Sequence, residues 1–122
     1  MGVIDTLAAV VKAYPQARVV AFADLSSQMV LASQGTQMVT QEYLERLCGE
    51  ARRSFDDPLF SLTLEAFSEP RAAIILGETD VKVFLRSEVE PADALCCICG
   101  HGIDLGGFVE TLQETLDSIS GA

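Results

Sequence analysis

The chain has 122 residues, of which 49% are hydrophobic, so it can bury one modest core and is not a mainly disordered chain. Its formal net charge of −10 argues against a nucleic-acid binder, since neutralising phosphates needs clustered Lys and Arg. The same charge disfavours docking on an anionic membrane and favours solubility and partners with basic patches. We therefore expect one soluble domain over residues 1–122.

The N-terminal segment MGVIDTLAAVVKAYPQA contains an apolar stretch that Asp5 and Lys12 interrupt. The positively charged start of a signal peptide is missing there, and no apolar run approaches the roughly 20 residues of a membrane span. The cysteines do not form the pattern of a secreted disulfide framework, because neighbours in one strand cannot bridge each other easily. They are Cys48, Cys96, Cys97 and Cys99. These features favour a reducing cytoplasm.

Periodicity predicts the elements of the first half of the chain. Apolar residues at helical spacing predict a helix over 2–14. Alternating apolar residues predict a strand over 17–24, and a short turn leads to a second strand over 29–33. Two strands joined so tightly most simply form an antiparallel hairpin. Thr40 is positioned to cap a second helix over 41–54.

The second half contains more predicted strands and a closing helix. The strands are expected at 60–67, 72–76, 81–86 and 95–99, and the helix at 105–119. The last strand, LCCIC, is a continuous run of small apolar residues, which is typical of a strand covered on both faces. This element order predicts an α+β domain with a single antiparallel sheet of five to six strands and helices on its faces.

Cysteines next to a histidine near the end of the chain provide side chains that zinc prefers. In an extended strand, Cys97, Cys99 and His101 point to one face at a spacing of about 7 Å, too far apart to converge on one ion. We interpret the cysteines as small core residues of a crowded strand and expect no metal or other cofactor. A thiol or metal switch built on this cluster is a weaker alternative.

The sequence shows no catalytic motif. His101 is the single histidine, and its position two residues from Cys99 at a strand end gives poor geometry for activating that thiol. The chain has no G-x-S-x-G elbow and no H-E-x-x-H motif. The glycine-containing segment HGIDLGG matches neither a P-loop nor a dinucleotide fingerprint. We therefore expect that the protein is not an enzyme.

The element order and four segments resemble the roadblock family of the dynein light chain roadblock and its bacterial relatives, whose sheet topology is similar to that of longin and profilin-like domains. These segments are VVAFADLSSQMVLASQG, TQEYLERLCGEARRSF, AAIILGETDVKVFLRS and ALCCICGHGIDLGGFVETLQETLDSI. They stand where the family has a hairpin, a long helix, a second hairpin, and a closing strand and helix. The chain departs from the family at Ser26–Ser27 in the first turn and in the additional strand over 60–67.

The resemblance implies a non-catalytic cytoplasmic homodimer that serves as a regulatory or scaffold module. In the family, two copies pair through the long second helix and the neighbouring edge strand, and the dimer binds small Ras-like GTPases or scaffold proteins. The residues that this implies at the dimer interface are Tyr43, Leu44, Leu47, Cys48, Gly49 and Ala51. The alternative is a small-molecule-sensing domain with a polar cavity lined by Ser33, Thr63 or His101.

Overall fold

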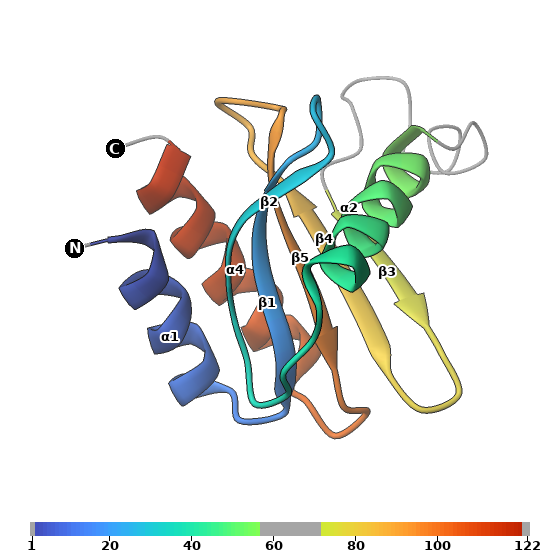
Figure 1. The fold of residues 1–122 in the computed structure, drawn as a ribbon. Coiled ribbons are helices and arrows are strands. Elements are labelled where there is room, and N and C mark those ends of the chain that lie inside the picture. The colour runs from blue at the N-terminus through green and yellow to red at the C-terminus, as the bar shows by residue number, and fades with distance from the viewer. Residues whose placement is uncertain (1, 57–71, 121–122) are drawn as a thin grey trace.

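Five antiparallel strands form one open sheet in the computed structural model, which describes residues 2–56 and 72–120 (Figure 1). The strands are β1 (Ala17–Asp24), β2 (Met29–Gln34), β3 (Ala72–Leu76), β4 (Val81–Arg86) and β5 (Asp93–Cys99). Their order across the sheet is β2-β1-β5-β4-β3, so the last strand of the chain lies at the centre of the sheet. This arrangement confirms the predicted antiparallel α+β fold.

Helices cover both faces of the sheet (Figure 1). α1 (Val3–Ala13) and α4 (Leu105–Ser120) lie side by side on one face, and α2 (Gln41–Asp56) lies on the other. None of the helices in the described ranges has the length and apolarity that crossing a membrane requires. The elements begin and end within two residues of the predicted bounds, and the strand predicted over 60–67 falls outside the described residues.

β5 separates two hydrophobic layers, because successive side chains of a strand point to opposite faces. The layer beneath α1 and α4 receives Leu95, Cys97 and Cys99. The layer beneath α2 receives Ala94, Cys96 and Ile98. None of these six side chains is more than 4% exposed. The predicted strand covered on both faces is therefore confirmed.

Polar side chains cap the N-termini of two of the helices. The Tyr43 N–H donates to Thr40 Oγ1 at 3.1 Å at the start of α2, which confirms the predicted cap. The Gly107 N–H donates to Asp104 Oδ1 at 3.4 Å at the start of α4. Such caps satisfy amides that the first helical turn leaves without a partner. A Cβ atom at Gly107 would lie 2.6 Å from Asp104 Oδ2 and 2.9 Å from the Tyr14 hydroxyl, so this glycine permits tight packing at the start of α4.

The Thr40 cap gives a prediction for stability. Replacing Thr40 by Ala should lower the free energy of unfolding by about 1 kcal/mol, because the Tyr43 amide loses its acceptor. Thr40→Ser keeps the hydroxyl and should retain most of the stability. Urea denaturation of the three proteins measures both differences. Equal losses in the Ala and Ser variants would contradict a capping role.

Candidate protein interface on α2 and β3

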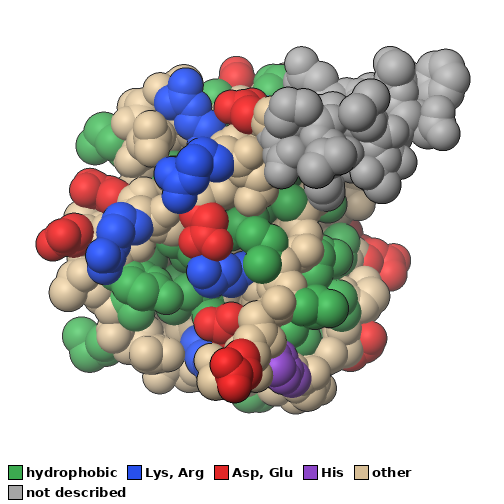
Figure 2. All heavy atoms as spheres, turned by 90° about the vertical axis from the view of Figure 1, so that its right-hand side faces the viewer, with side chains coloured by type: hydrophobic (Ala, Val, Ile, Leu, Met, Phe, Trp, Pro, Cys, Tyr) green, Lys and Arg blue, Asp and Glu red, His purple; other side chains and the backbone are tan. Residues whose placement is uncertain are grey.

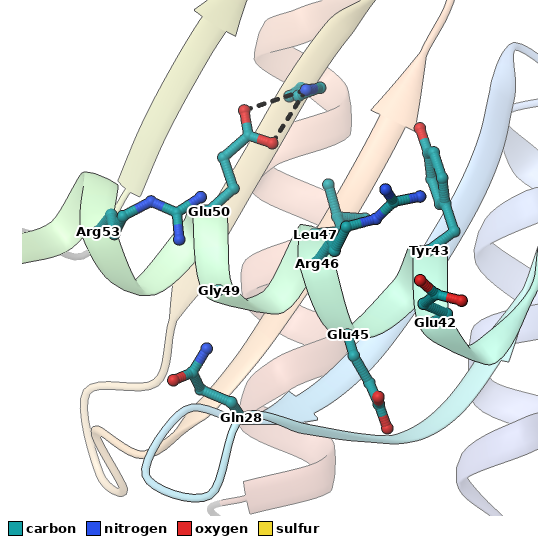
Figure 3. A pocket seen from close by; sticks show the side chains of 10 residues that line it. Gln28, Glu42, Tyr43, Glu45, Arg46, Leu47, Gly49, Glu50 and Arg53 are labelled. Carbon is teal, nitrogen blue, oxygen red and sulfur yellow. Dashed lines mark hydrogen bonds and ion pairs between the residues drawn. The ribbon is translucent and has the colours of Figure 1, made fainter.

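The outer side of α2 carries a row of side chains directed toward the β3 edge of the sheet. This row, the edge row, consists of Tyr43, Arg46, Glu50 and Arg53, whose spacing of three and four residues places them on one side of the helix (Figure 3). Lys82 Nζ on β4 donates to both carboxylate oxygens of Glu50 at 3.0 Å. Since β3 is the next strand beyond β4, the Lys82–Glu50 pair fixes the direction in which the edge row faces.

A second row on α2 faces the turn between β1 and β2. This turn row consists of Glu42, Glu45, Gly49 and Arg52. Arg52 Nη1 donates to Gln28 Oε1 at 3.4 Å. A Cβ atom at Gly49 would lie 2.8 Å from Gln28 Nε2, so the close neighbour of this glycine within one copy is the Gln28 side chain. Sequence reasoning attributed the glycine to contact with a second copy.

An open groove of about 660 Å³ runs over the same surface of α2. Its charged lining is balanced, with three acidic side chains from α2 against two arginines of α2 and Lys82. This balance contrasts with the net charge of −10 for the whole chain. Charges of both signs gather on this side of the molecule, next to a group of hydrophobic side chains (Figure 2). Such a surface suits a partner that carries both signs of charge.

Most residues predicted at the dimer interface pack against the sheet of their own chain. Leu44, Leu47, Cys48 and Ala51 are at most 4% exposed and belong to the hydrophobic layer beneath α2. Tyr43 is half-buried and lies in the edge row. The interface itself stays a prediction, but a second copy would meet the exposed rows of α2 rather than this apolar stripe.

β3 exposes apolar side chains at the end of the described sheet. Ile74 is 43% exposed, Ile75 is 36% exposed and Leu76 is 75% exposed. Because neighbouring side chains of a strand point to opposite faces, this exposure involves both faces of β3. The sequence predicted the strand but not its exposure, since the run AAIIL has no alternation that distinguishes an edge strand from a central one.

The cysteines and the histidine lie in different environments. Cys97 and Cys99 are fully buried, whereas His101 is exposed after β5, where its Nε2 lies 2.8 Å from the Gly77 carbonyl oxygen. Among residues 2–56 and 72–120, no three His, Cys, Asp or Glu side chains are grouped to hold a metal ion. Burial raises the pKa of Cys97 well above its ordinary value and that of Cys99 to about 12, which keeps both thiols protonated at neutral pH.

Ser33 and His101, two of the three residues proposed for a ligand cavity, lie at opposite edges of the described sheet. Ser33 lies on β2, at one edge of the sheet, while His101 contacts the turn between β3 and β4 at the other. Thr63 lies outside the described residues. The sensor alternative therefore has no shared site for Ser33 and His101.

The buried thiols predict a loss of stability in alkaline solution. Above the ordinary pKa of 9.0 the unfolded thiol loses its proton, while burial keeps the folded thiol of Cys97 neutral. The free energy of unfolding should therefore be constant near neutral pH and fall above about pH 9, by up to about 1.4 kcal/mol per pH unit for each such thiol. Urea denaturation between pH 7 and pH 10.5 measures this slope. Cys97→Ala should reduce it, and an unchanged slope would contradict the assignment.

Comparison with solved structures identifies the fold. A Roadblock/LC7 domain from Streptomyces avermitilis matches with a TM-score of 0.78 and 8% identity, over 95% of this chain and 92% of that one. MglB from Myxococcus xanthus matches with a TM-score of 0.75 and 16% identity, over 98% and 92% of the two chains. An MglB structure described as having a tetrameric arrangement matches with a TM-score of 0.74 and 14% identity, over 98% and 85%.

No sequence-family model and no curated protein sequence matches the chain. The likeness is therefore one of three-dimensional structure. It extends over nearly the whole length of each compared chain, and it agrees with the sheet order and helix placement described above. The chain has the roadblock/LC7 fold.

Proposed function

We propose that this protein is a non-catalytic cytoplasmic regulatory or scaffold module that acts as a homodimer and binds or regulates a small Ras-like GTPase. The observation that carries the proposal is β3, the strand at one end of the described sheet, which exposes Ile74, Ile75 and Leu76 beside the exposed side of α2. An exposed apolar edge strand favours pairing with another strand, and soluble proteins usually protect such edges.

The two edges of the sheet differ in a way that favours β3 as the pairing strand. The ladder between β1 and β2 is interrupted by a bulge at Leu31 of β2, opposite Phe22 and Ala23. The Gln41 side chain also donates to the Val30 carbonyl oxygen at 3.3 Å. Bulges and covering side chains are two ways in which proteins protect an edge from pairing. β3 pairs with β4 in a continuous register along its whole length. Its backbone is therefore the more regular template for a further strand.

A second copy of the chain is a suitable partner for β3. Two β3 strands related by a two-fold axis would pair antiparallel and join two sheets into one, and each copy would present the same patch to the other. This is the dimer that the resemblance to the roadblock family implies. The tetrameric arrangement described for an MglB structure supports assembly as a property of this fold.

The GTPase partner rests on the family resemblance. A dimer with a continuous sheet has two copies of α2 on one face, which gives a partner a wide platform with charges of both signs. The cytoplasmic location is supported by the four cysteines, which are buried free thiols and are typical of a reducing compartment.

Ile74→Lys tests the dimer. A lysine at this position places a charge on the pairing edge and should convert a dimer into a folded monomer of 13.1 kDa. Leu31→Lys is the matched control, because Leu31 is 57% exposed on the opposite edge strand and its replacement should leave the dimer intact. Light scattering on a sizing column gives both masses. Dissociation by Leu31→Lys with no effect of Ile74→Lys would contradict pairing through β3.

Binding to Ras-like GTPases of the same organism tests the partner. We expect the dimer to bind one of them preferentially in either its GTP or its GDP form and to change its rate of GTP hydrolysis or nucleotide exchange. The monomeric Ile74→Lys variant should lose the effect, while Leu31→Lys should retain it. Titration calorimetry and single-turnover hydrolysis measure the two properties. Absence of binding to every such GTPase in both nucleotide states would contradict this part of the proposal.

A further inference from the structure

We infer that the edge row of α2 sets the register of the dimer, with Arg46 of each copy paired to Glu50 of the other. The inference rests on the proposed homodimer and adds the contact that positions its two helices. It follows from the order of charges along the edge row, from the Lys82–Glu50 pair and from the pairing of β3 with β4.

The edge row is complementary to itself when two copies run antiparallel. A two-fold axis that passes α2 at position 48 brings position 46 opposite position 50 and position 43 opposite position 53. Arg46 and Glu50 each lie two residues from that axis, about 3 Å along the helix, so they come close over a wide range of crossing angles. Each dimer then contains the Arg46–Glu50 contact twice.

Neighbouring registers place like charges together. An axis at position 46 brings Arg46 opposite Arg46 of the second copy, and an axis at position 50 brings the two Glu50 carboxylates together. An axis midway between 49 and 50 brings Arg46 opposite Arg53. Like charges in contact disfavour these arrangements. An axis midway between 51 and 52 would bring Glu50 opposite Arg53, but positions 43 and 46 would then face positions beyond the end of α2 at Asp56. The axis at position 48 is therefore the register that gives every member of the edge row a partner.

Glu50 is held in position for this contact within its own chain. Its side chain is 32% exposed and accepts two hydrogen bonds from Lys82, whose side chain is 25% exposed. A carboxylate has lone pairs for further donors, and the planar guanidinium of an arginine matches its geometry. Glu50 can therefore bridge Lys82 of its own chain and Arg46 of the second copy.

The outer positions of the edge row agree with the same register. Tyr43 would face Arg53 of the second copy, and a guanidinium over an aromatic face is attractive. Within one chain the Arg46 guanidinium lies 5.9 Å from the centroid of the Tyr43 ring. When Arg46 pairs with Glu50 of the second copy, Arg53 of that copy would take this place over the ring.

The helix contact and the strand contact can share one two-fold axis. Lys82, which bonds Glu50, is paired across the ladder with Ile75. Antiparallel pairing of two β3 strands about Ile75 places the strand axis at this level. The axis through position 48 of α2 lies about 3 Å away along the helix, so one two-fold axis can serve both contacts.

Charge reversal at the two positions tests the register. Arg46→Glu places two acidic side chains together in each contact, and Glu50→Lys places two basic side chains together. Each variant alone should therefore form its homodimer with at least tenfold lower affinity and should be a monomer at concentrations where the wild type is a dimer. An equimolar mixture restores opposite charges in both contacts and should form a heterodimer. Native mass spectrometry distinguishes the three possible pairs, and circular dichroism checks that each variant is folded.

Matched variants separate this contact from general effects of charge. Glu45→Lys in the turn row and Lys12→Glu on α1 make the same changes in net charge at exposed positions and should leave the dimer intact. Lys82→Gln removes the pair within one chain while keeping Arg46 opposite Glu50, and it should also remain dimeric.

The outcomes distinguish the register from the dimer. Homodimers of both charge-reversed variants, with Ile74→Lys still monomeric, would overturn the register and leave pairing through β3 in place. If both variants are monomeric and their mixture forms no heterodimer, the register is also overturned. Restoring opposite charges would then not restore the dimer, so loss of the Arg46–Glu50 contact would not explain why the homodimers dissociate. A wild-type protein that is itself monomeric at high concentration would overturn the proposed dimer and this inference together.

Discussion

The burial of β5 on both of its faces is the constraint on which the rest of the structure depends. Its side chains from Ala94 to Cys99 are at most 4% exposed, and four of those six residues are alanine or cysteine. Small side chains let helices approach a central strand closely from both sides, and larger ones would overpack such layers. The α1–α4 pair and α2 are therefore both needed to exclude water from the strand.

With both faces covered, the sheet of the described residues ends at β2 and β3, and under the proposed function these end strands decide how two copies assemble. The bulge in β2 and the Gln41 side chain interrupt one edge, whereas β3 is regular and apolar. The same packing turns the apolar stripe of α2 inward and its charged rows outward. The proposed interface thus combines an apolar strand with a charged helix surface, in the way that protein interfaces combine an apolar centre with a polar rim.

The sequence predicted the elements well because their patterns are local. The small apolar run before Gly100 predicted a covered strand, and Thr40 predicted the start of α2. The sequence could not predict which partner each apolar surface meets. The spacing of Leu44, Leu47 and Ala51 is the same whether the stripe packs on the chain's own sheet or on a second copy, and the structure assigns it to the sheet. The exposure of β3 likewise depends on strand order, which local patterns do not encode.

The measurement that tests the central claim most directly is amide hydrogen exchange at concentrations where the protein is fully assembled. Pairing of two β3 strands predicts slow exchange at the alternate β3 amides that β4 does not bond, and faster exchange of those amides on dilution. The outward amides of β2 serve as the internal reference and should exchange quickly at every concentration. Fast exchange along β3 in the assembled protein, or protection that appears on β2 instead, would contradict the account.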